Sequence, residues 1–131
     1  YCGERGCVEQ YLSGPALEAA WGRRRYAQCP DLLSAPQVFA LAAQGDPLAK
    51  AVVCEYHADL AQFLLQVSNA LNPHLIVLGG GVSQAPLYTE VAARLSVRTF
   101  VKAPPVVPFA LSDAAGVIGA ALLSLPVDHR N

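Results

Sequence analysis

The sequence predicts an α/β fold rich in helices, and three observations support this. Apolar residues recur at the three-to-four spacing of amphipathic helices through residues 14–72. A short, continuous apolar run at 75–78 is then predicted to be a strand buried on both faces, and three glycines follow it directly. The order strand, glycine loop, helix, strand, helix over 75–125 is typical of α/β folds with right-handed crossovers.

Composition is consistent with one globular domain. The chain has 131 residues, of which 53% are hydrophobic and 15% charged, so it can bury a sizeable core and is not expected to be disordered. A net charge of -1 gives no general attraction to nucleic acid. The one basic cluster, Arg23-Arg24-Arg25, is interpreted as a solvated helix end near the negative pole of its dipole. No apolar run reaches the ~18 residues that span a bilayer, so we expect a soluble protein without a membrane segment.

The four cysteines leave two interpretations open. In a secreted protein Cys2, Cys7, Cys29 and Cys54 could pair as disulfides, and a truncated start would have removed a signal peptide. The uneven spacing and the large apolar fraction instead favour a reduced, cytosolic chain, in which clustered cysteines more often bind metal.

The first helix is predicted at about 14–25. Ser13 is a suitable N-cap, and Pro15 is tolerated in the first turn. The residues expected to face the core are Leu17, Ala20 and Trp21, with Arg24 on the edge of the same stripe. The turn formers around Cys29-Pro30-Asp31 predict a loop over 26–33.

Two more helices follow. Ser34 and Gln37 form a capping-box pattern, and Gly45 ends that helix. Its expected core residues are Val38, Leu41 and Ala42. Asp46-Pro47 then predicts the start of a long central helix that Asn72-Pro73 ends. Its apolar stripe consists of Leu48, Val52, Val53, Tyr56, Leu60, Phe63, Leu64, Val67 and Leu71.

After the strand at 75–78, the sequence predicts a helix over about 86–98, a strand over 106–111 and a final helix over 114–125. The first of these helices should direct Leu87, Val91 and Leu95 inward. Pro108 lacks a ladder donor, which favours an edge strand or a bulge. Ser112-Asp113 caps the last helix and Pro126 ends it. Two strands cannot cover this much apolar helix surface, so we infer that further strands of the same sheet lie upstream.

The first nine residues contain a candidate metal site. Cys2 and Cys7 each have a glycine beside them, and Gly3 and Gly6 can adopt the positive φ that brings two thiolates to one point. The alternative is a pair of thiols in a turn, since zinc requires four ligands and only two are present. Glu9 lies two residues beyond Cys7, either as a positioned carboxylate or as a solvated acid near a helix start.

Gly79-Gly80-Gly81 forms a second candidate site. Glycines between a buried strand and a helix allow backbone N–H groups to approach a phosphate, which the helix N-terminus also favours. Such turns also hold glycine for packing alone, and the Lys-Ser/Thr of a Walker loop is absent here. Cys54 and His57, three apart on the long helix, could share a metal, but we interpret them as packing residues.

The run Cys2-Gly3-x-x-Gly6-Cys7-x-Glu9-x-x-x-Ser13-Gly14 resembles the signature of the ROK family of bacterial sugar kinases and sugar-responsive repressors. In that family the pattern begins one cysteine earlier, before the position where this chain starts, and an upstream histidine completes a zinc site. The segment 111–121 is similar to the family's closing motif, with Leu111 and Ser112 in place of His-Gly. Capping by Asp113 and close packing at Gly116 and Gly119 explain most of that motif equally well.

The resemblance covers nearly the whole chain and implies part of the C-terminal lobe of an actin-like, ribonuclease-H-like ATPase fold, truncated at its N-terminus. Residues 1–9 would be the remnant of a zinc knuckle, 14–72 a helical segment and 75–125 a nucleotide-binding segment. It further implies structural Zn²⁺ at Cys2 and Cys7, sugar hydroxyls at Glu9, and ATP with Mg²⁺ near Gly79, Gly80 and Gly81.

The implied activity is that of an ATP-dependent hexose kinase acting at the 6-hydroxyl of fructose, N-acetylglucosamine, glucose or mannose. The segments 11–14 and 72–81 are most similar to the fructokinase and N-acetylglucosamine kinase branches, with a preference for fructokinase. The resemblance implies a cytoplasmic homodimer. The catalytic base is expected upstream, so this chain alone should not turn over sugar. Two alternatives are the effector domain of a ROK repressor, which would bind DNA through a preceding helix-turn-helix, and a plain interaction module.

Overall fold

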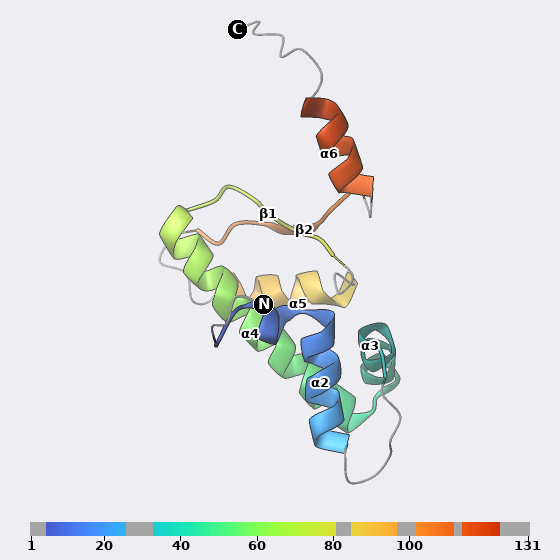
Figure 1. Ribbon diagram of the computed structural model, residues 1–131. Helices are drawn as coiled ribbons and strands as arrows, with labels where there is room; N and C mark the ends of the chain where they lie inside the picture. The colour runs from blue at the N-terminus through green and yellow to red at the C-terminus, as the bar shows by residue number, and fades with distance from the viewer. Residues whose placement is uncertain (1–4, 26–32, 81–84, 97–101, 112–113, 124–131) are drawn as a thin grey trace, which may run out of the picture.

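The computed structural model of the chain describes residues 5–25, 33–80, 85–96, 102–111 and 114–123. Within these ranges the chain forms six helices and two strands (Figure 1). In chain order they are α1 (Glu9–Leu12), α2 (Gly14–Arg25), α3 (Ala35–Gln44), α4 (Pro47–Leu71), β1 (Ile76–Leu78), α5 (Ala85–Ser96), β2 (Val106–Pro108) and α6 (Ala115–Leu123).

The elements are arranged around α4. Helices α1, α2, α3 and α5 all contact α4, and α5 also contacts β2. Helix α5 therefore lies between the strands and the long helix, and α2 and α3 pack elsewhere on α4 (Figure 1). This confirms the predicted helix-rich α/β fragment with a long central helix.

The helix ends form where the sequence places them. Ser34 N donates to Gln37 Oε1 at 2.8 Å, and α3 ends at Gly45, which has a φ of 102°. Asp46 Oδ1 accepts from Ala49 N at 2.7 Å, and α4 ends at Asn72 in a left-handed conformation with a φ of 45°. Each cap satisfies a backbone group that the helix itself leaves unpaired, so the boundaries of α3 and α4 follow from local chemistry.

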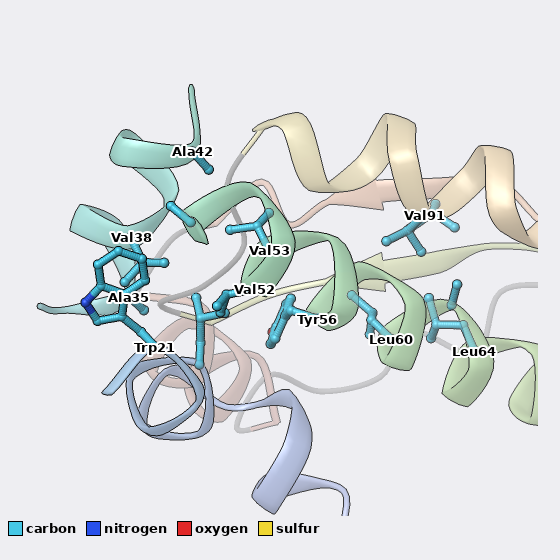
Figure 2. Close-up of a cluster of buried hydrophobic side chains, with 14 of the residues drawn as sticks. Trp21, Ala35, Val38, Ala42, Val52, Val53, Tyr56, Leu60, Leu64 and Val91 are labelled. Atoms are coloured by element: carbon cyan, nitrogen blue, oxygen red, sulfur yellow. The ribbon is translucent and has the colours of Figure 1, made fainter. Parts of the chain in front are cut away.

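The hydrophobic core is the layer of side chains between α4 and its neighbours (Figure 2). Trp21 on α2 lies close to Ala35 and Val38 of α3 in Figure 2, and both Trp21 and Val38 are fully buried. One predicted core position is wrong, because Leu71 is 74% exposed. It lies in the last turn of α4, beyond the neighbouring helices. The buried hydrophobic residues of α4 are Ala49, Val52, Val53, Tyr56, Leu60, Ala61 and Leu64.

The sheet consists of β1 and β2 in parallel, with Ile76 opposite Val106 and Leu78 opposite Pro108. The parallel pairing is as predicted, but both strands are shorter than predicted. The prediction of burial on both faces is wrong. Ile76 is buried, whereas Val77, which points to the opposite face, is 54% exposed. Of the described elements only α5 packs on the strands, so one face of the sheet has no cover.

Helix α6 stands apart from the other elements (Figure 1). Every side chain described on it is exposed, and Leu123 reaches 89%. The predicted close packing at Gly116 and Gly119 is wrong, because a Cβ added at either glycine would meet no heavy atom within 4 Å. That expectation assumed neighbours that the described residues do not supply. Ser112 and Asp113, the predicted cap, lie outside the described residues.

Helix α1, of four residues, was not predicted. Its N-cap residue Val8 makes no side-chain cap, so no capping signal marks its start. Among the described residues, no helix combines the length and the apolar character that a membrane crossing requires. The predicted loop at 26–33 lies outside the described residues except for its last position.

Candidate functional site

The turn before α1 brings Glu9 to the surface. Gly6 has a φ of 81°, so its predicted positive-φ conformation is confirmed. The backbone then closes over the half-buried Cys7, whose carbonyl accepts from Gln10 N at 2.9 Å. Glu9 is the first residue of α1, where a carboxylate is favoured by the positive end of the helix dipole.

The described part of this turn does not supply enough ligands for zinc. Cys7 is present, but Cys2 and Gly3 lie outside the described residues. Among the residues that are described, no three His, Cys, Asp or Glu side chains gather closely enough to hold a metal ion. A structural zinc needs four ligands, and the described turn offers one thiolate.

Glu9 lines a hollow of about 310 Å³ between α1 and the first half of α2. The hollow is also lined by Gln10, Ser13 and Arg23, so a carboxylate, an amide, a hydroxyl and a guanidinium surround one space. Glu9, Gln10 and Arg23 are exposed. Sequence reasoning identified Glu9 but missed Gln10 and Arg23, because nothing in their spacing indicates that they share a surface with Glu9.

Helix α1 is attached to the long helix by a side chain. The hydroxyl of Tyr56, on α4, donates to the carbonyl oxygen of Leu12 at 3.0 Å. Ser13 Oγ accepts from Ala16 N at 3.2 Å, which confirms its predicted role at the start of α2. These two bonds fix the last residue of α1 and the first turn of α2, the two helices that line the hollow. The periodicity of α4 marked Tyr56 as a core residue, but it could not reveal a hydrogen bond to a residue 44 positions away.

A second, smaller hollow of about 90 Å³ adjoins the first and shares Gln10, Ala16 and Arg23 with it. Glu55 lies on its rim and forms an ion pair with Arg24. The hydrogen bond from Arg24, opposed by partial desolvation, lowers the pKa of the Glu55 carboxyl.

The three arginines at the end of α2 each have a different environment. Arg23 is exposed on the two hollows, Arg24 pairs with Glu55, and the guanidinium of Arg25 lies 5.0 Å from the centre of the Trp21 ring. At that distance Arg25 and Trp21 make a cation–π contact. This arrangement agrees with the interpretation of the cluster as a helix end.

Gly79 and Gly80 follow β1 and are both exposed. Gly80 has a φ of 99°, a conformation that side chains with a Cβ rarely adopt, and its α-carbon faces open space. A Cβ at Gly79 would lie 3.2 Å from Cγ of Phe109, so glycine at this position also allows a close approach of the β2 end. Gly81 lies outside the described residues.

The structure does not bring Glu9 and the glycines into one site. Of the described elements, α1 contacts α2 and α4, whereas β1 contacts β2. Cys54 and His57 differ in burial and in their partners. Cys54 is exposed and its Sγ accepts from Arg94 Nη2 at 3.2 Å, whereas His57 is 5% exposed and stacks on Phe39 at 6.3 Å between ring centres. The placement of His57 agrees with the packing interpretation, whereas the packing interpretation of Cys54 is wrong, because Cys54 is exposed.

The model of the ROK family matches residues 1–126. The chain belongs to the ROK family. An N-acetyl-D-glucosamine kinase of Escherichia coli O1:K1 is 39% identical over 127 residues, which is 95% of this chain and 41% of that kinase. The chain thus spans about two fifths of the length of this curated relative.

Solved structures of ROK proteins share the fold. A ROK hexokinase from Thermus thermophilus superposes with a TM-score of 0.77 at 30% identity, over 92% of this chain and 41% of that one. A ROK glucokinase from Streptomyces griseus, in complex with glucose and AMPPNP, gives 0.73 at 26% identity over 93% and 45%. A ROK transcriptional regulator homologous to the E. coli MLC protein gives 0.68 at 28% identity, over 82% and 30%.

Proposed function

We propose that this chain is the C-terminal part of an ATP-dependent hexose kinase that phosphorylates the 6-hydroxyl of its sugar. The observation that supports this most directly is the position of Glu9. It is exposed in the first turn of α1 and lines the hollow of about 310 Å³ together with Gln10, Ser13 and Arg23. Because relatives of similar sequence and fold are named as sugar kinases, we infer that a sugar substrate binds in this hollow.

The polar groups around the hollow suit a polyol. An ionised Glu9 carboxylate accepts hydrogen bonds from sugar hydroxyls at two oxygens. Gln10 both donates and accepts, and the Arg23 guanidinium donates. Each sugar hydroxyl can donate one hydrogen bond and accept others, so it can be satisfied by this mixture. In the proposal Glu9 binds and orients the sugar, and the base that removes the hydroxyl proton is supplied by another part of the intact protein.

ATP with Mg²⁺ would bind at the end of β1. Backbone N–H groups can approach a phosphate most closely where no side chain intervenes, and Gly79 and Gly80 provide two such positions at the surface. Gly81, beyond the described residues, would extend the same loop. The nucleotide supplies the phosphoryl group, and the chain's role here is to hold it. Structural Zn²⁺ at Cys2 and Cys7 would hold the turn before Glu9.

N-acetylglucosamine is the first sugar to test, since the 39% identical relative carries that name. Glucose and mannose follow, because hexokinase and glucokinase structures share the fold. Fructose, which the sequence favoured, is tested beside them without support from these relatives. A cytoplasmic homodimer is part of the same proposal.

The decisive experiment uses the full-length product of the gene that encodes this chain. ADP release is measured by a coupled assay with each of the four sugars, for the native protein, for Glu9→Gln and for Asp59→Asn. Asp59 is an exposed acid that lines the smaller, adjoining hollow but not the larger one, and it serves as the control for loss of a nearby negative charge. We expect Glu9→Gln to raise the KM for the sugar by about tenfold or more, the cost of one charge-assisted hydrogen bond. Equal KM values for both variants would contradict the role of Glu9, and absence of ADP release with every sugar would contradict the kinase.

A second candidate is the sugar-binding effector domain of a ROK repressor. The observation that favours it is the TM-score of 0.68 with a ROK transcriptional regulator. Sequencing the gene upstream of this chain separates the two, because a helix-turn-helix domain there favours the repressor. Sugar-dependent DNA binding by the full-length product, without ADP release, would establish that alternative.

A further inference from the structure

A third hollow lies between α3, α4 and α5. Its volume is about 290 Å³, and it shares no lining residue with the two hollows beside α1. The hydrophobic side chains of Phe39 and Val53 form part of its wall, whereas Lys50, Glu90 and Arg94 are its charged residues. It is separate from the proposed sugar site. Neither the family resemblance nor the proposed function assigns a role to it.

Two buried polar atoms beside this hollow lack partners. His57 lines the hollow and is 5% exposed, and its Nε2 is sealed from solvent without a hydrogen bond. Nε of Arg94 is buried and unpaired in the same way. Buried polar groups in native proteins usually have a hydrogen-bond partner, so each of these two atoms requires an explanation. Trp21, Ser68 and Tyr88 also have such atoms among the described residues, but His57 and Arg94 are the two that line this hollow, where a ligand would supply a partner after a rotation of either side chain.

Arg94 has unused binding capacity. Its Nη2 donates to Cys54 Sγ at 3.2 Å, and sulfur is a weak acceptor for a guanidinium that carries five donors. Among the residues that the structure describes, the one ion pair joins Arg24 and Glu55, so Arg94 has no carboxylate partner there. Glu90 lies on the same helix, one turn earlier, but forms no ion pair with Arg94 within 4.0 Å.

The balance of charge around the hollow is positive. Lys50 and Arg94 contribute two cations and Glu90 one carboxylate. Burial lowers the pKa of His57, so its imidazole is neutral at pH 7 and adds no charge. An anion is therefore favoured over a cation or a neutral polar molecule. The hydrophobic wall in addition favours a ligand with an apolar body over a hydrated inorganic ion.

We propose that this hollow is a binding site for a small organic acid. The carboxylate lies against Arg94 and Lys50, and the apolar body packs on Phe39 and Val53. A guanidinium binds a carboxylate through two parallel N–H bonds, which uses the donors that Cys54 leaves unfilled. A small rotation of the His57 ring toward the carboxylate would give its unpaired nitrogen a partner.

The test uses benzoate as a probe, with benzamide as its neutral analogue of the same shape and inorganic phosphate as an anion without an apolar body. Each is titrated into the 15N-labelled full-length product of the gene that encodes this chain, and the amide chemical shifts of α3, α4 and α5 are followed. We expect benzoate to shift the amides around Val53 and Arg94 saturably, with a Kd at least tenfold lower than that of benzamide or phosphate. Equal Kd values for benzoate and benzamide, or shifts that do not saturate, would overturn the proposal.

Two variants and a control locate the site. Arg94→Gln should weaken benzoate binding about tenfold or more, and Lys50→Gln severalfold, since Lys50 is exposed at the mouth. Lys102→Gln removes an exposed cation elsewhere and should leave the Kd unchanged. If Arg94→Gln does not fold, the benzoate affinity of Lys50→Gln tests the site instead, because an exposed lysine can be replaced with little effect on stability. Unchanged benzoate affinity in every variant that folds would overturn the site.

Discussion

The hydroxyl of Tyr56, in the middle of α4, donates a hydrogen bond to the carbonyl oxygen of Leu12, the last residue of α1. The donor and acceptor are 3.0 Å apart, and Tyr56 is 5% exposed. Burial raises the pKa of Tyr56, so the phenol keeps its proton and remains a donor. The bond ties the short helix that carries Glu9 to the longest helix of the protein.

Replacing this donor should destabilise the fold. Tyr56→Phe removes the hydroxyl and leaves the Leu12 carbonyl without its partner, which costs about 1–2 kcal/mol. The free energy of unfolding from urea titration measures the effect. Tyr11→Phe is the matched control, because Tyr11 is 54% exposed, and it should change stability by less than about 0.5 kcal/mol. Equal effects of the two substitutions would show that the bond to Leu12 contributes nothing.

The stability of the chain should depend on pH through His57. Desolvation lowers the pKa of His57, the charge of Glu90 opposes this and that of Arg94 adds to it. Two other titratable groups, Lys50 and Cys54, line the same hollow as His57 and lie on its own helix. The neighbour from α3 is Phe39, which carries no charge.

An unfolded histidine has a pKa near 6.5, so below that pH the unfolded chain binds more protons than the folded chain. Stability is therefore full above about pH 6.5 and falls as the pH drops toward the lowered pKa, by at most about 1.4 kcal/mol per pH unit. Urea titrations at pH 7.5 and 5.5 should show a smaller loss for His57→Gln than for the native chain, whereas His74→Gln, at an exposed histidine, should behave as the native chain does. A direct measurement of the His57 pKa by NMR at or above 6.5 would contradict the prediction.

The N-cap of α4 should contribute about as much to the free energy of unfolding as a typical helix cap. Asp46→Ala removes the acceptor for Ala49 N and should cost about 1 kcal/mol. Asp59→Ala, on an exposed turn of the same helix, should cost much less. Thermal unfolding followed by circular dichroism compares the two. If Asp46→Ala destabilised the protein less than Asp59→Ala, water would be replacing the Asp46 acceptor without loss of stability.

Alanine at Gly79 and alanine at Gly80 should each destabilise the protein, but for different physical reasons. Replacing Phe109 distinguishes the two reasons. Gly79→Ala places a methyl group 3.2 Å from Cγ of Phe109 and should cost about 1–3 kcal/mol, most of which Phe109→Ala in the same chain should remove. Gly80→Ala faces open space but keeps a φ of 99°, so its cost of about 1–2 kcal/mol should persist in the Phe109→Ala background. Urea titrations of Phe109→Ala, the two single alanine variants and the two double variants measure the coupling, and equal rescue of both alanine variants would contradict this explanation.

The helix ends were predictable because their causes lie within a few residues. The cap at Asp46, the pair of Ser34 and Gln37, and the left-handed Gly45 each depend on side chains and dihedral preferences that the sequence states directly. Helix α1 was missed because it lacks such a signal.

Burial was less predictable wherever it depends on distant neighbours. The run at 75–78 has the composition of a strand covered on both sides, yet Val77 is exposed because only α5 covers the sheet among the described elements. The apolar side chains of α6 are exposed for the same reason, because no described element packs on this helix. Of the candidate site, Glu9 could be recognised from its motif, whereas Arg23 and the hydroxyl of Tyr56 join it only through the packing of α1 and α2 on α4.

The position of α5 has a mechanical consequence. Among the described elements, α5 is the one that contacts both a strand, β2, and α4. A displacement of the strands, such as one produced by a molecule seated at Gly80, is therefore transmitted to the long helix by a shift of α5. Val91 and Leu95, both fully buried on α5, are the side chains that would have to move first.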